Sequence, residues 1–176
     1  ASTVIVNDDA PTERLVVNNP AFDLIGLTGL RNDPRYSAID GKRPLLFGEN
    51  IENYKNFSVA VLDSGVEGTH DKLKDNFAGY VDFIGSAGNG TTRQLTLLDT
   101  NSDGTVSDAE IATASDKFID NVGHGTHVAG TVGSSDPELG VATGVDLLGL
   151  RVGDASGLNP ADYVEALRWV LQHRTE

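Results

Sequence analysis

The chain has 176 residues, 39% of them hydrophobic, which suits a single domain with a core and excludes a globally disordered chain. Its net charge of −13 argues against nucleic acid or an anionic membrane as a partner, because both require a basic face. There is no cysteine, so disulfides, thiolate metal sites and a cysteine nucleophile are excluded, and no apolar run is long enough to span a membrane.

The N-terminal third of the sequence is polar and rich in turn residues. We interpret residues 1–20 as an N-terminal arm, in extended form or as two short strands, or as the remnant of a pro-segment. The domain proper is expected to cover residues 21–176. The apolar spacing of residues 20–30 predicts a short helix, and the prolines and glycines of residues 32–56 predict loops.

The rest of the chain alternates between strand and helix patterns. Apolar segments predict buried strands over residues 57–62, 81–84 and 145–152. Helices are predicted over residues 108–118 and 122–132. Strands and helices that alternate with short links indicate the α/β class, with a parallel sheet covered by helices.

The final predicted helix runs from Pro160 to about His173, with Asn159 as its N-cap. Its large apolar side chains recur at helical spacing and are expected to line one face: Tyr163, Val164, Leu167, Val170 and Leu171.

Two residues at the ends of these elements carry chemistry. Asp63 follows a predicted strand, at the edge where open parallel sheets bind ligands, and Gly65 permits an immediate turn. His124 opens a helix of small residues that can approach the sheet closely, whereas His127 is expected to pack in the core. A carboxylate that holds an imidazole, and an imidazole that takes a proton from a nucleophile, are two parts of a catalytic triad.

The segments SVAVLDSG (residues 58–65) and GHGTHVAG (residues 123–130) resemble, in this order, the Asp and His motifs of the subtilisin-like serine proteases, or subtilases (peptidase family S8). The resemblance extends over residues 22–176. It implies a three-layer α/β/α sandwich with a mainly parallel sheet, present here as a partial domain. It also implies that Asp63 orients His124, and that His124 acts as general base and acid in peptide-bond hydrolysis.

The resemblance further implies a segment that binds the substrate. A protein or peptide substrate would lie extended against the backbone and add a strand to it. Gly157 would leave room for this approach, and the expected segment consists of Ala155, Ser156, Gly157 and Leu158.

The serine motif of the family and its oxyanion-stabilising asparagine do not occur in this sequence. Ser64 and Ser134 lie beside the two motifs but on the wrong elements to act as the nucleophile. We therefore expect about half of a catalytic domain, which a C-terminal half carrying the serine would complete, either as a second chain or as further residues. Such a half should leave part of its sheet and some apolar surface uncovered.

The stretch between the two motifs contains an insertion at about residues 85–120 with the segment DTNSDGTVSDAE (residues 99–110). This segment satisfies the calcium-loop pattern D-x-[DN]-x-[DN]-G-x5-E, and the alternative is an acidic, solvated turn. Residues 91–98 fit a strand as well as a helix, so we expect a calcium loop without a helix–loop–helix frame. The predicted ligands are Asp99, Asn101, Asp103, Thr105, Ser107 and Glu110.

Three functions compete at this point. The first is part of a calcium-stabilised serine endopeptidase, extracellular or secreted, although an intracellular protease would also fit. The second is a catalytically inactive subtilase-like module that binds calcium and peptides. The third is a calcium-binding structural or adhesion domain. A serine motif in the C-terminal continuation would favour the enzyme.

Overall fold

The structure, a computed structural model, describes residues 3–5, 14–16, 19–33, 58–85, 95–97, 100–101, 107–114 and 120–173. The expected loops over residues 34–56 and most of the calcium loop lie outside these ranges.

A four-stranded sheet forms the centre of the fold, in the order β3-β6-β4-β5. The strands are β3 (Ser58–Asp63), β4 (Phe77–Asp82), β5 (Thr96–Leu97) and β6 (Asp146–Arg151). β6 runs parallel to both of its neighbours, and only the short β5 is antiparallel to β4. The α/β class with a mainly parallel sheet, expected from the sequence, is therefore confirmed. The strand predicted over residues 81–84 begins earlier, at Phe77, where a register shift between Phe77 and Gly79 disturbs the alternation.

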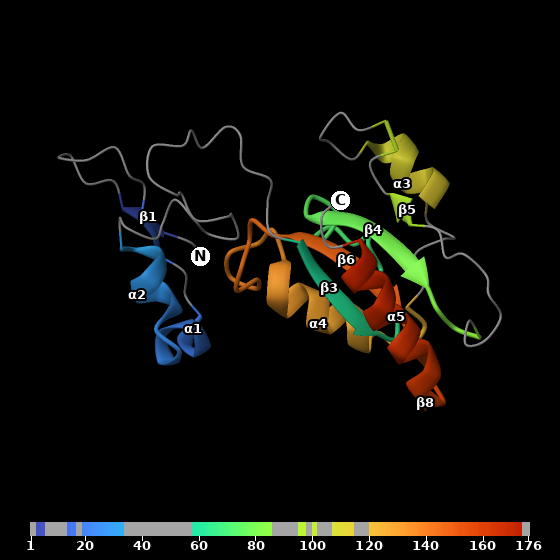
Figure 1. The fold of residues 1–176 in the computed structure, drawn as a ribbon. Coiled ribbons are helices and arrows are strands. Elements are labelled where there is room, and N and C mark those ends of the chain that lie inside the picture. The colour runs from blue at the N-terminus through green and yellow to red at the C-terminus, as the bar shows by residue number, and fades with distance from the viewer. Residues whose placement is uncertain are drawn as a thin grey trace.

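Helices cover the two faces of this sheet (Figure 1). α4 (His124–Gly133) packs on one face and α5 (Pro160–Gln172) on the other, which gives three layers. Side chains of β6 point alternately to the two faces of the sheet, so Leu147 packs on the α4 side and Leu150 on the α5 side.

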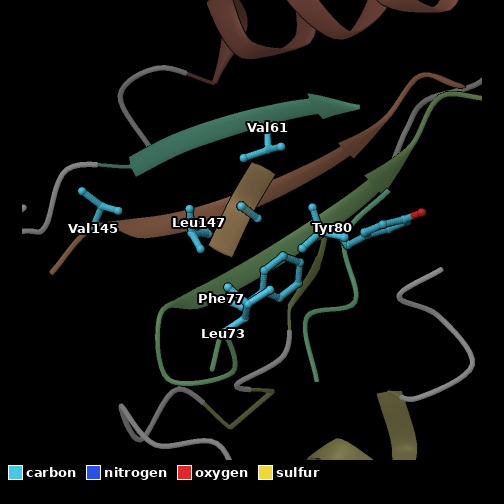
Figure 2. Close-up of a cluster of buried hydrophobic side chains, with 8 residues drawn as sticks. Val61, Leu73, Phe77, Tyr80, Val145 and Leu147 are labelled. Atoms are coloured by element: carbon cyan, nitrogen blue, oxygen red, sulfur yellow. The ribbon is translucent and has the colours of Figure 1, made fainter. Parts of the chain in front are cut away.

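The larger core lies between α4 and the sheet. Figure 2 shows side chains from β3, β4 and β6 and the segments beside them gathering on this face. The buried members are Val61, Val66, Leu73, Phe77, Tyr80, Ala129, Val145 and Leu147. The second cluster, under α5, contains Val81, Phe83, Leu150, Val152 and Ala166.

The face of α5 that contacts the sheet differs from the one predicted. Ala166 is fully buried, and Trp169 and Val170 pack beside it. Of the predicted face, four residues are exposed: Tyr163 (37%), Val164 (46%), Leu167 (43%) and Leu171 (64%). The prediction followed the largest apolar side chains, whereas close packing on the sheet selected the small Ala166. The cap was predicted correctly, since the Asn159 side chain accepts a hydrogen bond from the Ala161 N–H.

The N-terminal elements are short. β1 (Thr3–Ile5) pairs antiparallel with β2 (Arg14–Val16), which confirms the two strands considered for the arm. The single helix predicted over residues 20–30 is two helices, α1 (Pro20–Leu24) and α2 (Leu27–Arg31). Gly26 separates them, because its φ of 78° lies in the left-handed region.

Arg31 attaches these two helices to the loop after α4. Its guanidinium donates hydrogen bonds to the carbonyls of Pro137 (2.9 Å), Gly140 (2.6 Å) and Val141 (2.8 Å). The remaining elements are α3 (Asp108–Ala114) and the hairpin of β7 (Gly153–Asp154) and β8 (Gly157–Leu158). Within the described ranges, no helix has the length and apolar character needed to cross a membrane.

Candidate active site

Asp63 is the last residue of β3, at the carboxyl end of the parallel strands. The backbone turns directly after it, and Gly65 has a φ of 120°, which residues with a side chain rarely adopt. The N–H of Ser64 donates a hydrogen bond to Asp63 Oδ1 at 2.7 Å. The turn therefore fixes the carboxylate while leaving it open toward α4.

His124 is the first residue of α4 and follows Gly123, the N-cap, which has a φ of 83°. Its Nδ1 lies 2.8 Å from Asp63 Oδ1 and 3.0 Å from Asp63 Oδ2. The two side chains therefore meet within hydrogen-bonding distance at one edge of the sheet, as the two sequence motifs predict. The imidazole is 67% exposed, whereas the carboxylate beneath it is 17% exposed.

Gly125 makes this close approach of helix and strand possible. A Cβ at position 125 would lie 2.0 Å from the carbonyl oxygen of Gly65 and 2.9 Å from the Cβ of Asp63. The buried residues of α4 recur every four positions, at Gly125, Ala129 and Gly133, and this row faces the sheet. His127 lies on another side of the helix and is exposed, so its predicted place in the core was wrong.

The electrostatics of the pair favour a charged imidazole. The hydrogen bond with Asp63, together with the negative charge of that carboxylate, raises the pKa of His124 above its ordinary value of 6.5. If Nδ1 carries a proton, it donates to Asp63, and Nε2 is left as the basic nitrogen. The arrangement can therefore accept a proton at Nε2 and stabilise the imidazolium that forms.

The two serines next to the motifs have structural contacts. Ser64 Oγ donates to Asp120 and accepts a hydrogen bond from the Gly125 N–H at 3.1 Å. Ser134 Oγ donates to the carbonyl of Lys72, and the residue is fully buried. Both hydroxyls are thus engaged in hydrogen bonds within the fold.

Asp120 is a site residue that sequence reasoning missed. Its carboxylate accepts hydrogen bonds from the start of α4 and from Ser64. The available signal was an aspartate just before a helix whose N-cap is glycine, which has no side chain to cap the helix with.

The predicted substrate-binding segment forms the tip and second strand of the β7–β8 hairpin. Ala155, Ser156, Gly157 and Leu158 are all exposed, and Gly157 has a φ of 109°. The hairpin begins beside the backbone of Asp63, since the N–H of Val152 donates to the Asp63 carbonyl at 2.9 Å. One edge of Gly157–Leu158 is paired with β7.

Three of the six predicted calcium ligands, Asp99, Asp103 and Thr105, lie outside the described residues. Of the other three, Glu110 accepts hydrogen bonds from both Asn101 and Ser107. Its Oε1 accepts hydrogen bonds from the N–H of Asn101 (3.3 Å) and from the N–H (2.8 Å) and hydroxyl (2.9 Å) of Thr100. Its Oε2 accepts from the N–H (3.0 Å) and hydroxyl (2.8 Å) of Ser107.

These bonds keep Glu110 ionised. Backbone and side-chain hydrogen bonds from Ser107, followed by those from Thr100, lower the pKa of Glu110 from 4.5 to about 2. Ser107 and Glu110 also form a capping box at the start of α3, because the Glu110 N–H donates back to Ser107 Oγ. Among the described residues, no three His, Cys, Asp or Glu side chains cluster as a metal site.

Comparison with known proteins identifies the family. The model of the Subtilase family (Peptidase_S8) matches residues 54–176, which include both motifs and the whole sheet. The chain belongs to the subtilase family. The parallel sheet with helices on both faces is accordingly part of a subtilisin-like fold.

Three bacterial relatives, all from Bacillus subtilis (strain 168), show the same kinship. Bacillopeptidase F is 32% identical over 117 residues, which are 64% of this chain and 7% of that protein. The major intracellular serine protease is 33% identical over 101 residues, 57% of this chain and 24% of that protein. The minor extracellular protease Vpr is 33% identical over 114 residues, 64% of this chain and 12% of that protein. The matched region thus spans less than a quarter of each of these relatives.

Proposed function

We propose that this chain supplies the aspartate and histidine of a serine endopeptidase that hydrolyses peptide bonds in protein substrates. The observation that carries the proposal is the 2.8 Å contact between His124 Nδ1 and Asp63 Oδ1. Asp63 would hold the tautomer in which Nε2 is basic, and His124 would take the proton of a serine hydroxyl as it attacks the carbonyl carbon. His124 would then return that proton to the leaving amine.

The serine, in this proposal, comes from the C-terminal half of the catalytic domain, as further residues or as a second chain. Two features support such a partner. Among the described strands, β3 lies at an edge of the sheet and pairs only with β6, so its other edge is available to a further strand. Beside β3, α5 exposes apolar side chains that the C-terminal half could cover. They are Tyr163, Val164, Leu167 and Leu171.

The test is labelling of the full-length protein with a fluorophosphonate, which reacts with an activated serine. We expect one covalent adduct on the serine-bearing part, and its loss in the His124→Ala variant. The Asp75→Ala variant, which removes an exposed carboxylate on the loop before β4, serves as the control. A folded full-length protein that binds peptides without being labelled would instead be the catalytically inactive module.

The substrate, we propose, adds a strand to the free edge of residues 155–158 near the active site. The hairpin is exposed, and it is joined to the Asp63 backbone through Val152. Leu158 is 59% exposed and would contact the substrate. Leu158→Asp should raise KM more than it lowers kcat, and equal kinetics in the variant and the wild type would refute this placement.

Calcium is the proposed cofactor of the loop at residues 99–110. The chemistry of the donor set fits, because calcium prefers carboxylate, amide, hydroxyl and carbonyl oxygens and Glu110 is ionised. The backbone N–H groups of Asn101 and Ser107 donate hydrogen bonds to Glu110, which places these two predicted ligands beside it. Bidentate binding would require the Thr100 and Ser107 hydroxyls to turn away from Glu110. The ion would stiffen the insertion, since a single loop without a paired partner suits a structural role.

Chelation tests this site separately from catalysis. The melting temperature of the full-length protein should fall when calcium is removed, and Asp103→Ala should lower it in the presence of calcium. Asp108→Ala removes an exposed carboxylate outside the ligand set and should leave the calcium effect unchanged. Identical melting of the wild type with and without chelator would remove calcium from the account.

We also propose an extracellular or secreted location, where calcium is abundant enough to load a single loop of moderate affinity. The names of the relatives include both an intracellular and an extracellular protease. Fractionation of the source culture decides between the two, because the proposal requires the protein in the medium and not in the washed cells.

A further inference from the structure

We propose that Asp120 is a positioning residue for the Asp63–His124 pair: its carboxylate ties the first turn of α4 to the residue that follows Asp63. This inference rests on the proposed function, because it assigns Asp120 a task in the same catalytic site. The described hydrogen bonds of Asp120 go to Ser64 in the first motif, to Gly123 and Thr126 in the second, and to Val122 directly before it.

One oxygen of Asp120 links the two motifs directly. Oδ1 accepts a hydrogen bond from Ser64 Oγ at 2.8 Å, and it also accepts from the N–H groups of Gly123 (2.9 Å) and Val122 (3.2 Å). Ser64 is bonded to Asp63 in sequence, and Gly123 to His124. A single atom therefore sets the separation between the turn after the carboxylate and the residue before the imidazole.

The other oxygen fixes the helix itself. Oδ2 accepts from the N–H (2.9 Å) and hydroxyl (2.6 Å) of Thr126. The same hydroxyl oxygen accepts a hydrogen bond from the N–H of Glu67 at 2.9 Å. Thr126 thus joins Asp120 to the loop that continues from Ser64 and Gly65, so the network closes around the start of α4.

This network replaces a missing helix cap. The N-cap of α4 is Gly123, whose lack of a side chain leaves the first N–H groups of the helix to find other acceptors. Ser64 Oγ accepts from the Gly125 N–H, and Asp120 accepts from the Thr126 N–H. Both acceptors come from outside the helix, so capping the helix also locks His124 in place over Asp63.

The charge of Asp120 serves the same end. A helix N-terminus carries partial positive charge and opposes an imidazolium there. Two carboxylates offset it: Asp63 on β3 and Asp120 on the segment before α4 both raise the pKa of His124. Burial works against ionisation of Asp120, but hydrogen bonds from Thr126, Ser64 and Gly123 outweigh it and lower its pKa, so the carboxylate is charged at neutral pH.

Kinetics of the full-length protein test the inference. Asp120→Ala should lower kcat about 10- to 100-fold while KM changes less than about threefold, because misplacement of a catalytic base slows the chemical step more than binding. Asp120→Asn keeps an acceptor at Oδ1 but loses the charge and places an NH2 donor where Oδ2 accepts from Thr126, and it should be less impaired than Asp120→Ala. Asp75→Ala, which also removes one negative charge, should match the wild type.

Titration of the His124 ring by NMR gives a second readout that does not depend on peptidase activity. We expect a lower pKa for His124 in Asp120→Ala than in the wild type and in Asp75→Ala. An inactive wild type would overturn the proposed function, yet this titration would still decide the positioning role. An active wild type whose Asp120→Ala variant keeps both kcat and the His124 titration would overturn the role of Asp120 alone.

Ser64→Ala keeps the test decisive if Asp120→Ala does not fold. It removes one hydroxyl that bridges Asp120 and the Gly125 N–H, while the other contacts of Asp120 remain. A fall in kcat at unchanged KM supports the inference, and kinetics equal to those of Asp75→Ala contradict it.

Discussion

The Asp63–His124 site and the loop around Glu110 are each built on one carboxylate, but they use it in opposite ways. Asp63 joins segments far apart in the chain and is held by one backbone N–H and one imidazole. Glu110 receives five hydrogen bonds, all from residues within ten positions of it.

The difference separates the carboxylate proposed to act in catalysis from a structural one. The described hydrogen-bonding partners of the Asp63 carboxylate are the Ser64 N–H and the His124 ring, so a change in the charge of the ring acts directly on this carboxylate. Glu110 accepts hydrogen bonds from Thr100, Asn101 and Ser107, which hold it ionised and tie these residues to it. Predictions at the two sites should therefore diverge: activity should depend on the first, and acid stability on the second.

The largest effect is expected at His124. Replacing it by alanine should reduce kcat of the full-length protein about 10⁴-fold or more, since the proposed general base is lost. Thermal stability should stay close to wild type because the ring is 67% exposed. Peptide hydrolysis and melting curves check both parts. An alanine variant with near wild-type kcat would place the chemistry elsewhere.

Gly125 tests whether close packing forms the site. Gly125→Ala should lower the free energy of unfolding by about 1–3 kcal/mol and reduce activity, because the new Cβ would press on the backbone at Gly65 and on Asp63. Gly130→Ala, in the same helix, is the matched control, since its Cβ would meet nothing within 4 Å. It should raise stability by about 0.5–1 kcal/mol through helix propensity. Denaturant unfolding measures both, and equal effects would refute the packing argument.

Glu110 should show its effect in acid. A carboxyl whose pKa is lower in the folded than in the unfolded protein stabilises the fold at pH values above its unfolded pKa. This stabilisation is lost as the pH falls through the pKa of the folded protein. For Glu110 the window runs from 4.5 down to about 2. Without calcium, Glu110→Gln should melt a few degrees below wild type near pH 6, and the gap should close across that window. A gap independent of pH would contradict the assignment.

The sequence predicted the contact between Asp63 and His124 because two short motifs place each residue on a distinct kind of element. A valine-rich strand ends at Asp63, and a helix of small residues begins at His124. Both patterns are local, and the parallel sheet follows from their alternation. Asp63 and His124 meet because the parallel strands end, and the helices that follow them begin, at the same edge of the sheet.

Other features depended on tertiary contacts that no local pattern contains. Asp120 acts through Ser64 and Thr126, which lie on two different elements. The buried face of α5 was set by how closely Ala166 and Trp169 could fit the sheet, and the more apolar face was left exposed. The break between α1 and α2 depends on the positive φ of Gly26, which an apolar spacing pattern does not register.

The most direct test of the account is the pKa of the His124 ring, measured by NMR in the wild type and in Asp63→Asn. We expect a pKa above 6.5 in the wild type, raised by the hydrogen bond and charge of Asp63, and a clearly lower pKa in the variant. A ring that titrates at the same pH in both proteins would show that the two side chains do not interact and would contradict the proposed catalytic pair.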